Sequence, residues 1–257
     1  MKILGVRIDN LTKKEILEKI EFFLNDEKPG TISAEKVRGK LHQIATVNPE
    51  FILRAQKDEA FKNILNKSDL NVADGVGVWY AFLRHLKYLQ DRIAGVDLMQ
   101  EILQIADEKK LSVFLAIHKN GLSSFVEIRN VLHKKYPNIE IFGEDADPRK
   151  NKKILAKINH DLVFCNFGFP EQEKFINLLK NRQNSSLRLT GSQGKIRIAM
   201  GVGGSFDFLT GKISRAPLWM QKIGLEWLWR FVQEPRYRFK RVLNAVFVFP
   251  VRILFNR

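Results

Sequence analysis

Apolar residues occur in short continuous runs, and the segments between the runs repeat apolar positions every three or four residues. The continuous runs are typical of strands buried on both faces, and the periodic segments are typical of amphipathic helices. Strands are predicted at 2–8, 42–48, 69–73, 111–117, 139–143, 161–168 and 195–204. Helices are predicted at 11–24, 50–66, 76–86, 96–109, 121–136, 148–159 and 170–181.

Local signals support several of these boundaries. Thr12 and Glu15 form a Thr-x-x-Glu capping box, and Asn48 precedes Pro49 as a natural N-cap. Pro170 is predicted to start a helix, and residues 26–42 are predicted to be a loop. Strands that alternate with helices predict an α/β fold with an open, mostly parallel, Rossmann-like sheet and helices on both faces.

The pattern changes after Gly204, and this change predicts a boundary. Residues 1–204 are expected to form the α/β domain. Residues 205–257 are helix-like, rich in Trp, Phe and Arg, and without a further clear strand, so we expect them to form a separate helical element.

Composition narrows the class of protein. The chain has 257 residues, of which 45% are apolar, enough for one sizeable domain with a core. Its single cysteine, Cys165, excludes disulfides and cysteine-rich zinc sites, and the five histidines show no metal-ligand spacing. Neither a signal peptide nor a membrane-spanning run is expected.

The net charge of +15 is concentrated near the C-terminus, where residues 212–257 hold ten basic and two acidic side chains. Such a cluster predicts an anionic partner, which could be nucleic acid, phospholipid or a phosphorylated substrate. The apolar stretch 242–255, interrupted by Pro250 and Arg252, favours an interfacial membrane anchor over a nucleic-acid groove. The structural alternative is a packed helix with a solvated basic face.

The segment VADGVGVWYA places Asp74 at the predicted end of a strand. Three interpretations are open: an N-cap, part of a glycine-rich phosphate loop, or a catalytic carboxylate. The phosphate loop is the weakest, because Tyr80 stands where a dinucleotide fingerprint has its third glycine. The same absence disfavours a nucleotide-dependent oxidoreductase.

Other polar residues stand near predicted strand ends, where ligands bind in parallel sheets. Thr46 could be a buried strand residue and Asn48 a helix cap, or both could face a ligand. Arg92 could pair with Asp91 or Asp97, or could clamp a diphosphate. Gln172 could be exposed, or could bond a sugar or phosphate.

Several blocks together resemble the WecG/TagA/CpsF glycosyltransferases. They appear in the family's order and cover most of the chain. The blocks are TVNPEFILRAQKDEAF (46–61), LNVADGVGVWYAF (70–82), RIAGVDLMQEIL (92–103), FGFPEQE (167–173), GVGGSFDFLTGKISRAP (201–217) and GLEWLWRFVQEPRYRFKR (224–241).

The resemblance implies an inverting, metal-independent transfer of a hexose from a UDP-sugar to a polyprenyl-diphosphate-linked sugar. The donor sugar it suggests is N-acetylmannosamine or a related hexose. The pathway it suggests is the synthesis of teichoic acid or another surface polysaccharide. It further implies a cytoplasmic protein, peripheral at the inner face of the membrane, with no cofactor and no nucleic-acid partner. The oligomeric state stays open.

The resemblance also assigns roles. Asp74 becomes the general base, and Thr46, Asn48, Arg92 and Gln172 become substrate-binding residues. Arginines of the C-terminal element are expected to reach the donor diphosphate, without individual assignment: Arg215, Arg230, Arg236, Arg238 and Arg241. The chemistry is coherent, because one carboxylate can activate an acceptor hydroxyl and arginines can stabilise a leaving diphosphate.

Two features depart from the family pattern. Residues 166–169 (NFGF) replace a Gly-x-Gly before the Pro-x-Gln-Glu segment. Residues 30–41 and 182–194 are longer and more polar than the family leads us to expect. The first change bears on which sugar the pocket would accept more than on the type of reaction.

Overall fold

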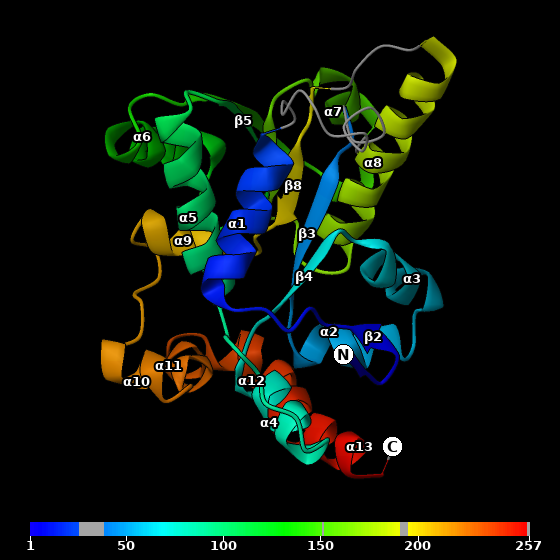
Figure 1. The fold of residues 1–257 in the computed structure, drawn as a ribbon. Coiled ribbons are helices and arrows are strands. Elements are labelled where there is room, and N and C mark those ends of the chain that lie inside the picture. The colour runs from blue at the N-terminus through cyan, green and yellow to red at the C-terminus, as the bar shows by residue number, and fades with distance from the viewer. Residues whose placement is uncertain (26–38, 151, 191–194, 256–257) are drawn as a thin grey trace.

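One open parallel sheet forms the centre of the molecule (Figure 1). The computed structural model describes residues 1–25, 39–150, 152–190 and 195–255. The six strands lie in the order β4-β3-β8-β7-β5-β6, and every neighbouring pair is parallel. This confirms the predicted fold class. The strands are β3 (His42–Val47), β4 (Leu70–Ala73), β5 (Ser112–His118), β6 (Glu140–Ala146), β7 (Leu162–Cys165) and β8 (Ile198–Gly201).

Helices cover both faces of the sheet, as the continuous apolar strands predict. One face packs against α1 (Lys13–Leu24), α5 (Gly95–Glu108), α6 (Phe125–Lys135) and α9 (Ser205–Leu209). The other packs against α2 (Pro49–Ala55), α3 (Glu59–Lys67), α7 (Lys152–Lys157) and α8 (Glu171–Thr190), with a short 3₁₀ turn at Pro148–Lys150. Side chains alternate between the faces, so Phe164 joins the first core and Cys165 joins the other.

Two local predictions are wrong. Residues 2–8 do not form one strand but an antiparallel hairpin of β1 (Lys2–Ile3) and β2 (Val6–Arg7), outside the main sheet. Leu4 and Gly5 turn the chain with positive φ angles. The helix predicted at 50–66 is two helices, because the Asp58 side chain accepts from the Phe61 amide and starts α3.

The remaining elements are present, but several bounds differ from the prediction: β7 and β8 are shorter than 161–168 and 195–204, α6 starts at Phe125, the helix predicted at 148–159 is a 3₁₀ turn and the short α7, and α8 starts at Glu171 and runs to Thr190. Thr12 caps α1 in the predicted capping box, and Asn48 caps α2 through the amides of Glu50 and Phe51. The predicted loop 26–42 lies outside the described residues from 26 to 38, as do residues 191–194 of the long polar segment.

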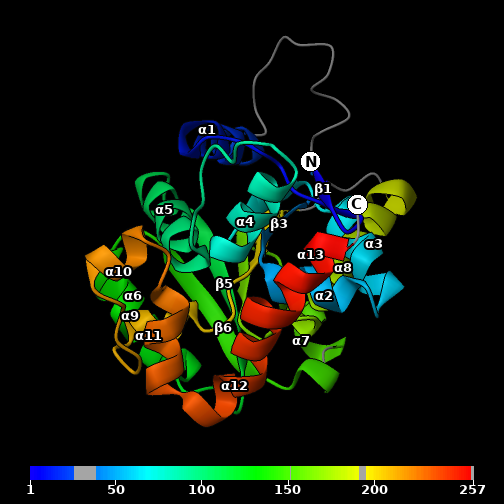
Figure 2. The same ribbon diagram turned by 90° about the horizontal axis from the view of Figure 1, so that it is seen from below.

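The C-terminal helices lie beneath the edge where the parallel strands end (Figure 1). Seen from below, α10, α11, α12 and α13 spread across that edge together with α4 (Figure 2). Their bounds are α4 Val76–Arg84, α10 Leu218–Lys222, α11 Glu226–Gln233, α12 Pro235–Leu243 and α13 Phe249–Phe255, with a π-helical turn at Asn244–Val248. The predicted buried helix at 76–86 is only half buried, because Trp79 and Leu83 are exposed.

Within the described residues, no helix combines the length and the apolar character needed to cross a bilayer.

Candidate active site

Asp74 is the first residue after β4, at the carboxyl edge of the sheet. Its amide donates to the carbonyl of Val47 on the neighbouring strand, at 2.9 Å. The parallel register sets Thr46 opposite Val72 and Val47 opposite Ala73, so Asp74 follows in line with Asn48. Two predicted site residues are therefore adjacent because their strands are adjacent.

The structure contradicts the interpretation of Asp74 as the cap of α4. Gly75 occupies the N-cap position, with φ of 84°, and no side chain caps the helix. Gly77 also has a packing role, because an added Cβ would stand 2.5 Å from Cγ of Pro49 and 3.6 Å from Cδ1 of Phe249. The two glycines thus let the chain turn sharply and let α4 pack closely.

The carboxyl group of Asp74 has an unusual electrostatic environment. Its side chain keeps partial solvent contact, yet it is closely surrounded by protein. Burial, with the negative charges of Glu226 and Asp97, raises its pKa to about 7. The positive charge of Arg92 and a hydrogen bond from the Gly75 amide oppose that rise. The group therefore changes protonation state near neutrality, as suits a general base.

Arg92 faces the C-terminal helices. Its Nη2 donates to the Gln221 carbonyl of α10 at 2.9 Å. Neither Asp91 nor Asp97 pairs with it, and it has no ion pair with any residue that the structure describes. The local-pairing interpretation is therefore wrong, and the guanidinium keeps donors for a ligand.

Thr46 and Asn48 both have structural roles. The Thr46 side chain is buried in β3, where a Cβ added to Gly95 would stand 3.2 Å from its Oγ1. The Asn48 Oδ1 accepts from the amides of Glu50 at 3.0 Å and Phe51 at 3.1 Å, which is the predicted helix cap. Both still border the edge where Asp74 lies.

Gln172 is buried, so the alternative that its side chain is exposed to solvent is wrong. Its Oε1 accepts from the Gly203 amide at 3.1 Å, and its Nε2 donates to Glu173 at 2.8 Å. An added Cβ at Gly201 would stand 2.4 Å from Nε2. Gln172 therefore braces the loop after β8, and burial raises the pKa of neighbouring Glu173 to about 8.

Among the five candidate arginines of the C-terminal element, Arg215 interacts electrostatically with Asp74. Its Nη1 and Nη2 bond the two carboxyl oxygens of Asp97 at 2.8 and 3.2 Å, and its Nε lies 3.2 Å from Glu226. Burial opposes its charge, but Asp97, Glu226 and Asp74 together raise its pKa.

The other four arginines differ in their surroundings. Arg230 stacks over the Phe208 ring at 4.7 Å and lies 3.6 Å from Glu234, and burial lowers its pKa to about 10. Arg238 bonds the same Glu234 at 2.8 Å. Arg241 holds Glu50 at 2.9 and 2.6 Å, which ties α12 to α2. Arg236 is exposed.

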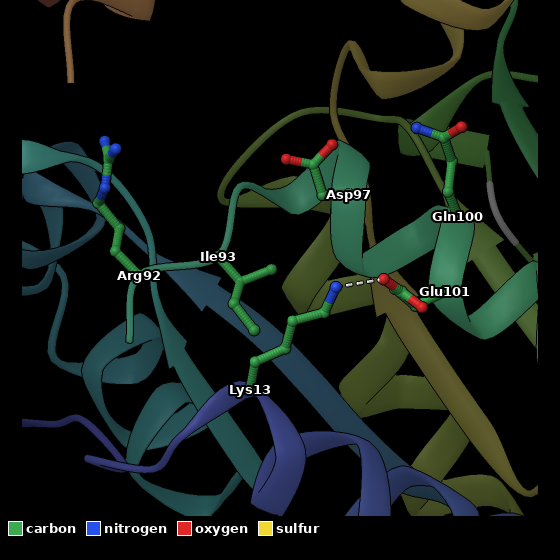
Figure 3. A pocket seen from close by; sticks show the side chains of 6 residues that line it. All are labelled: Lys13, Arg92, Ile93, Asp97, Gln100 and Glu101. Carbon is green, nitrogen blue, oxygen red and sulfur yellow. Dashed lines mark hydrogen bonds and ion pairs between the residues drawn. The ribbon is translucent and has the colours of Figure 1, made fainter. Parts of the chain in front are cut away.

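A pocket of about 430 Å³ opens beside this cluster, between α1 and the start of α5 (Figure 3). Arg92 and Asp97 line it together with Ile93, and a Lys13–Glu101 ion pair of 2.5 Å crosses it. The wall therefore offers charged and amide groups of the kind that bind hydroxylated or phosphorylated ligands.

Sequence reasoning missed how three residues act on the predicted site residues. Asp97 and Glu226 are carboxylates whose charges act on Asp74, and the Gln221 carbonyl accepts a hydrogen bond from Arg92. Gly224, with φ of 81°, packs so tightly that a Cβ would stand 3.1 Å from Cβ of Val76. The carboxylates stand in the segments RIAGVD (92–97) and GLEW (224–227), but their interaction with Asp74 depends on the fold, which brings these distant segments together.

In the described part of the chain, no group of three or more His, Cys, Asp or Glu side chains is arranged to hold a metal ion.

Comparisons with known proteins agree with this architecture. The model of the "Glycosyl transferase WecG/TagA/CpsF family" matches residues 1–257. A Bacillus subtilis (strain 168) protein is 35% identical over 208 residues, covering 78% of this chain and 75% of the relative. A Staphylococcus aureus (strain MW2) protein is 30% identical over 257 residues, covering 98% of this chain and 91% of the relative. Both relatives are named N-acetylglucosaminyldiphosphoundecaprenol N-acetyl-beta-D-mannosaminyltransferase.

Proposed function

The chain belongs to the WecG/TagA/CpsF glycosyltransferase family, and on that premise we propose its substrates and mechanism. It transfers N-acetylmannosamine from UDP-N-acetylmannosamine to undecaprenyl-diphosphate-linked N-acetylglucosamine. The names of its relatives support this choice of donor and acceptor. The product would be an intermediate of teichoic acid or a related surface polymer.

Asp74 acts as the general base in this proposal, and its position and ionisation carry the argument. Ionised Asp74 takes the proton of the acceptor hydroxyl as that oxygen bonds to the anomeric carbon of the donor. The bond from the anomeric carbon to the diphosphate oxygen breaks on the opposite side, so configuration inverts and UDP leaves. A pKa of about 7 leaves roughly half of the molecules ionised at neutral pH.

Arg92 compensates the charge that develops on the departing diphosphate. Its guanidinium acts on the Asp74 carboxyl and donates to Gln221, while its other donors have no carboxylate partner among the described residues. A planar guanidinium suits bidentate contact with phosphate oxygens. We propose that Arg92 and arginines of the C-terminal element do this without a divalent metal.

Arg230 is the C-terminal arginine best suited to assist. It stacks on Phe208, and a Cβ added at Gly204 would stand 3.2 Å from its Nη2, so it lies against the loop after β8. Thr46, Asn48 and Gln172 shape the neighbouring edge. We keep the proposed division into a catalytic domain at 1–204 and a C-terminal element at 205–257 that completes the site, with the first helix of that element, α9, packed on the sheet of the catalytic domain.

The C-terminal element also supplies the proposed membrane face. Large apolar side chains at positions three or four residues apart are exposed along its last helices, including Phe239, Leu243, Phe247, Val251 and Leu254. On the same helix, Phe249 and Ile253 are buried against α2 and α4. The element is thus packed on its inner side and apolar on its outer side.

Helix α4 packs along α13 and also exposes apolar side chains, Trp79 and Leu83, and Leu86 is exposed in the turn that follows it. Arg84 ends α4, and Lys87 lies just beyond it. Apolar side chains surrounded by basic ones bind anionic interfaces. We propose peripheral binding at the cytoplasmic face of the membrane, where a polyprenyl-linked acceptor would be reached.

A donor panel tests the proposed reaction. Purified protein is given UDP-N-acetylmannosamine, UDP-N-acetylglucosamine or UDP-glucose, with a short-chain polyprenyl-diphosphate-N-acetylglucosamine and EDTA. UDP release and product mass are measured. Turnover of the first donor alone, undiminished by EDTA, is expected. Preference for another donor would refute the sugar assignment, and loss of turnover in EDTA would refute the metal-free mechanism.

A further inference from the structure

Arg215 joins two carboxylates that come from different parts of the chain. Its Nη1 and Nη2 grip Asp97 in the first turn of α5, at 2.8 and 3.2 Å. Its Nε faces Glu226 in the first turn of α11, at 3.2 Å. Such a two-sided arrangement needs the planar fork of arginine, which lysine lacks.

The same two carboxylates act on Asp74. The charged groups that act on the Asp74 carboxyl include Glu226 from α11, Asp97 from α5, and Arg92 from the segment before α5. Arg215 and Asp74 also attract each other. Without Arg215, Asp74 would lie near two uncompensated negative charges and one positive charge.

Arg215 Nη2 also donates to Oε1 of Gln221 at 2.9 Å, and the segment that carries Arg215 and Glu226 has further anchors that do not involve Arg215. The Gln221 carbonyl accepts a hydrogen bond from Arg92, and the Gln221 Nε2 donates to the Ala216 carbonyl at 2.6 Å. Met220 and Ala216 are buried, and Gly224 packs against Val76. Loss of the Arg215 charge would therefore leave the segment in place over the strand edge.

We propose that Arg215 is a positioning residue for the base: by pairing with both Asp97 and Glu226 it holds α5 and α11 together and offsets two negative charges that act on Asp74. This role rests on the proposed function of Asp74 as the base. The role is distinct from direct contact with the donor diphosphate, since the Arg215 guanidinium already contacts Asp97, Glu226 and the Gln221 side-chain oxygen.

The test uses the full chain and two readouts. Asp residues are ¹³C-labelled, the Asp74 carboxyl resonance is identified by its loss in Asp74→Asn, and its titration is followed by NMR. The pH dependence of kcat/KM is measured on the same proteins. Arg215→Gln should raise both midpoints by about 0.5–1 pH unit, because the two carboxylates lose their counter-charge. Glu226→Gln should lower them by a similar amount.

The double variant Arg215→Gln/Glu226→Gln should return the midpoints toward those of the wild type. Lys212→Gln is the matched control, because it removes one cation of the same element that pairs with Glu127 on α6 at 2.8 Å. It should leave both midpoints unchanged. An unchanged or lowered NMR midpoint in Arg215→Gln would overturn the proposal.

The two readouts also separate this inference from the function it rests on. If the NMR midpoint rises but the activity profile stays fixed, Arg215 controls Asp74 but Asp74 is not the base. If Asp74→Asn abolishes transfer while Arg215→Gln leaves the NMR midpoint unchanged, the base assignment stands and the role of Arg215 fails.

Discussion

Arg92 donates to the carbonyl of Gln221 at 2.9 Å, and this bond joins the carboxyl edge of the sheet to the C-terminal helices. Arg92 lies just before α5, whereas Gln221 lies in α10. The contact holds Arg92, whose positive charge acts on Asp74, against α10. The C-terminal element is therefore part of the site's electrostatic environment.

Replacement of Arg92 should weaken catalysis more than it weakens folding. Arg92→Gln removes the charge proposed to compensate the leaving diphosphate, so kcat/KM should fall by about 10²–10³. Arg92→Lys keeps the charge without the fork and should recover only part of this loss. Steady-state kinetics together with thermal unfolding measure both effects. Near wild-type kcat/KM in Arg92→Gln would contradict the assignment.

The midpoint of the pH dependence of activity should lie well above the usual pKa of an aspartate. Burial, with Glu226 and Asp97, raises the pKa of Asp74 to about 7, and the base must be ionised to accept a proton. The logarithm of kcat/KM should rise with pH and level off above a midpoint near 7. A profile that is flat from pH 5 to 9 would contradict this environment.

Asp74→Asn should stabilise the folded protein in alkaline solution. Because folding raises the pKa of Asp74, the folded state holds its proton more tightly, and the stability due to protonation is fully present below pH 4. That stability is lost as pH rises toward and through 7. At pH 8 the variant should therefore unfold with a free energy about 1–3 kcal/mol larger than the wild type.

Urea unfolding at pH 4 and pH 8 checks this sign. The difference between variant and wild type should shrink toward zero at the lower pH. A variant that is less stable than the wild type at pH 8 would show that the ionised carboxylate stabilises the fold instead.

Gly77→Ala should destabilise the junction of α4 with α2. Its Cβ would stand 2.5 Å from Cγ of Pro49, so one of the two helices must move. Overpacking of this kind costs about 1–3 kcal/mol. The control is Pro49→Ala, which removes the obstructing atom. In a double-mutant cycle, the double variant should lose less free energy of unfolding than the sum of the two single losses. Additive losses would contradict the contact.

Membrane binding should depend on the outer face of the C-terminal helices. The variant Phe247→Ser/Val251→Ser/Leu254→Ser removes exposed apolar side chains and leaves buried Phe249 and Ile253 intact. Affinity for vesicles with anionic lipid should fall about tenfold or more. The matched control Leu122→Ser/Val126→Ser changes exposed apolar residues near α6 and should bind like the wild type.

Two other outcomes would reject the membrane proposal. Equal vesicle binding by the triple variant would assign binding to another surface. A wild-type dimer that dissociates in the triple variant, without vesicle binding by either form, would identify the face as a subunit interface.

Local sequence signals predicted the sheet and many helix starts, because burial on both faces and side-chain capping act over a few neighbouring residues. The Thr12–Glu15 box and the Asn48 cap are examples. The division at Asp58 was missed, because apolar periodicity continues through the break and only the side-chain bond to Phe61 marks it.

The environment of Asp74 could not be predicted in the same way. Asp97 and Glu226 follow it by many residues, and their charges reach it only because α5 and α11 begin at the same edge. One of the three interpretations of Asp74, the helix cap, is wrong for a local reason: Gly75, with a positive φ angle, and not Asp74, is the residue that precedes α4.

The most direct test of the account compares wild type and Asp74→Asn in the transfer of N-acetylmannosamine to polyprenyl-diphosphate-N-acetylglucosamine at pH 8. The exchange keeps the size of the side chain and removes its basicity. With folding verified by thermal unfolding, kcat should fall by about 10³ or more. A folded Asp74→Asn protein that turns over at near the wild-type rate would contradict the assignment of Asp74 as the base.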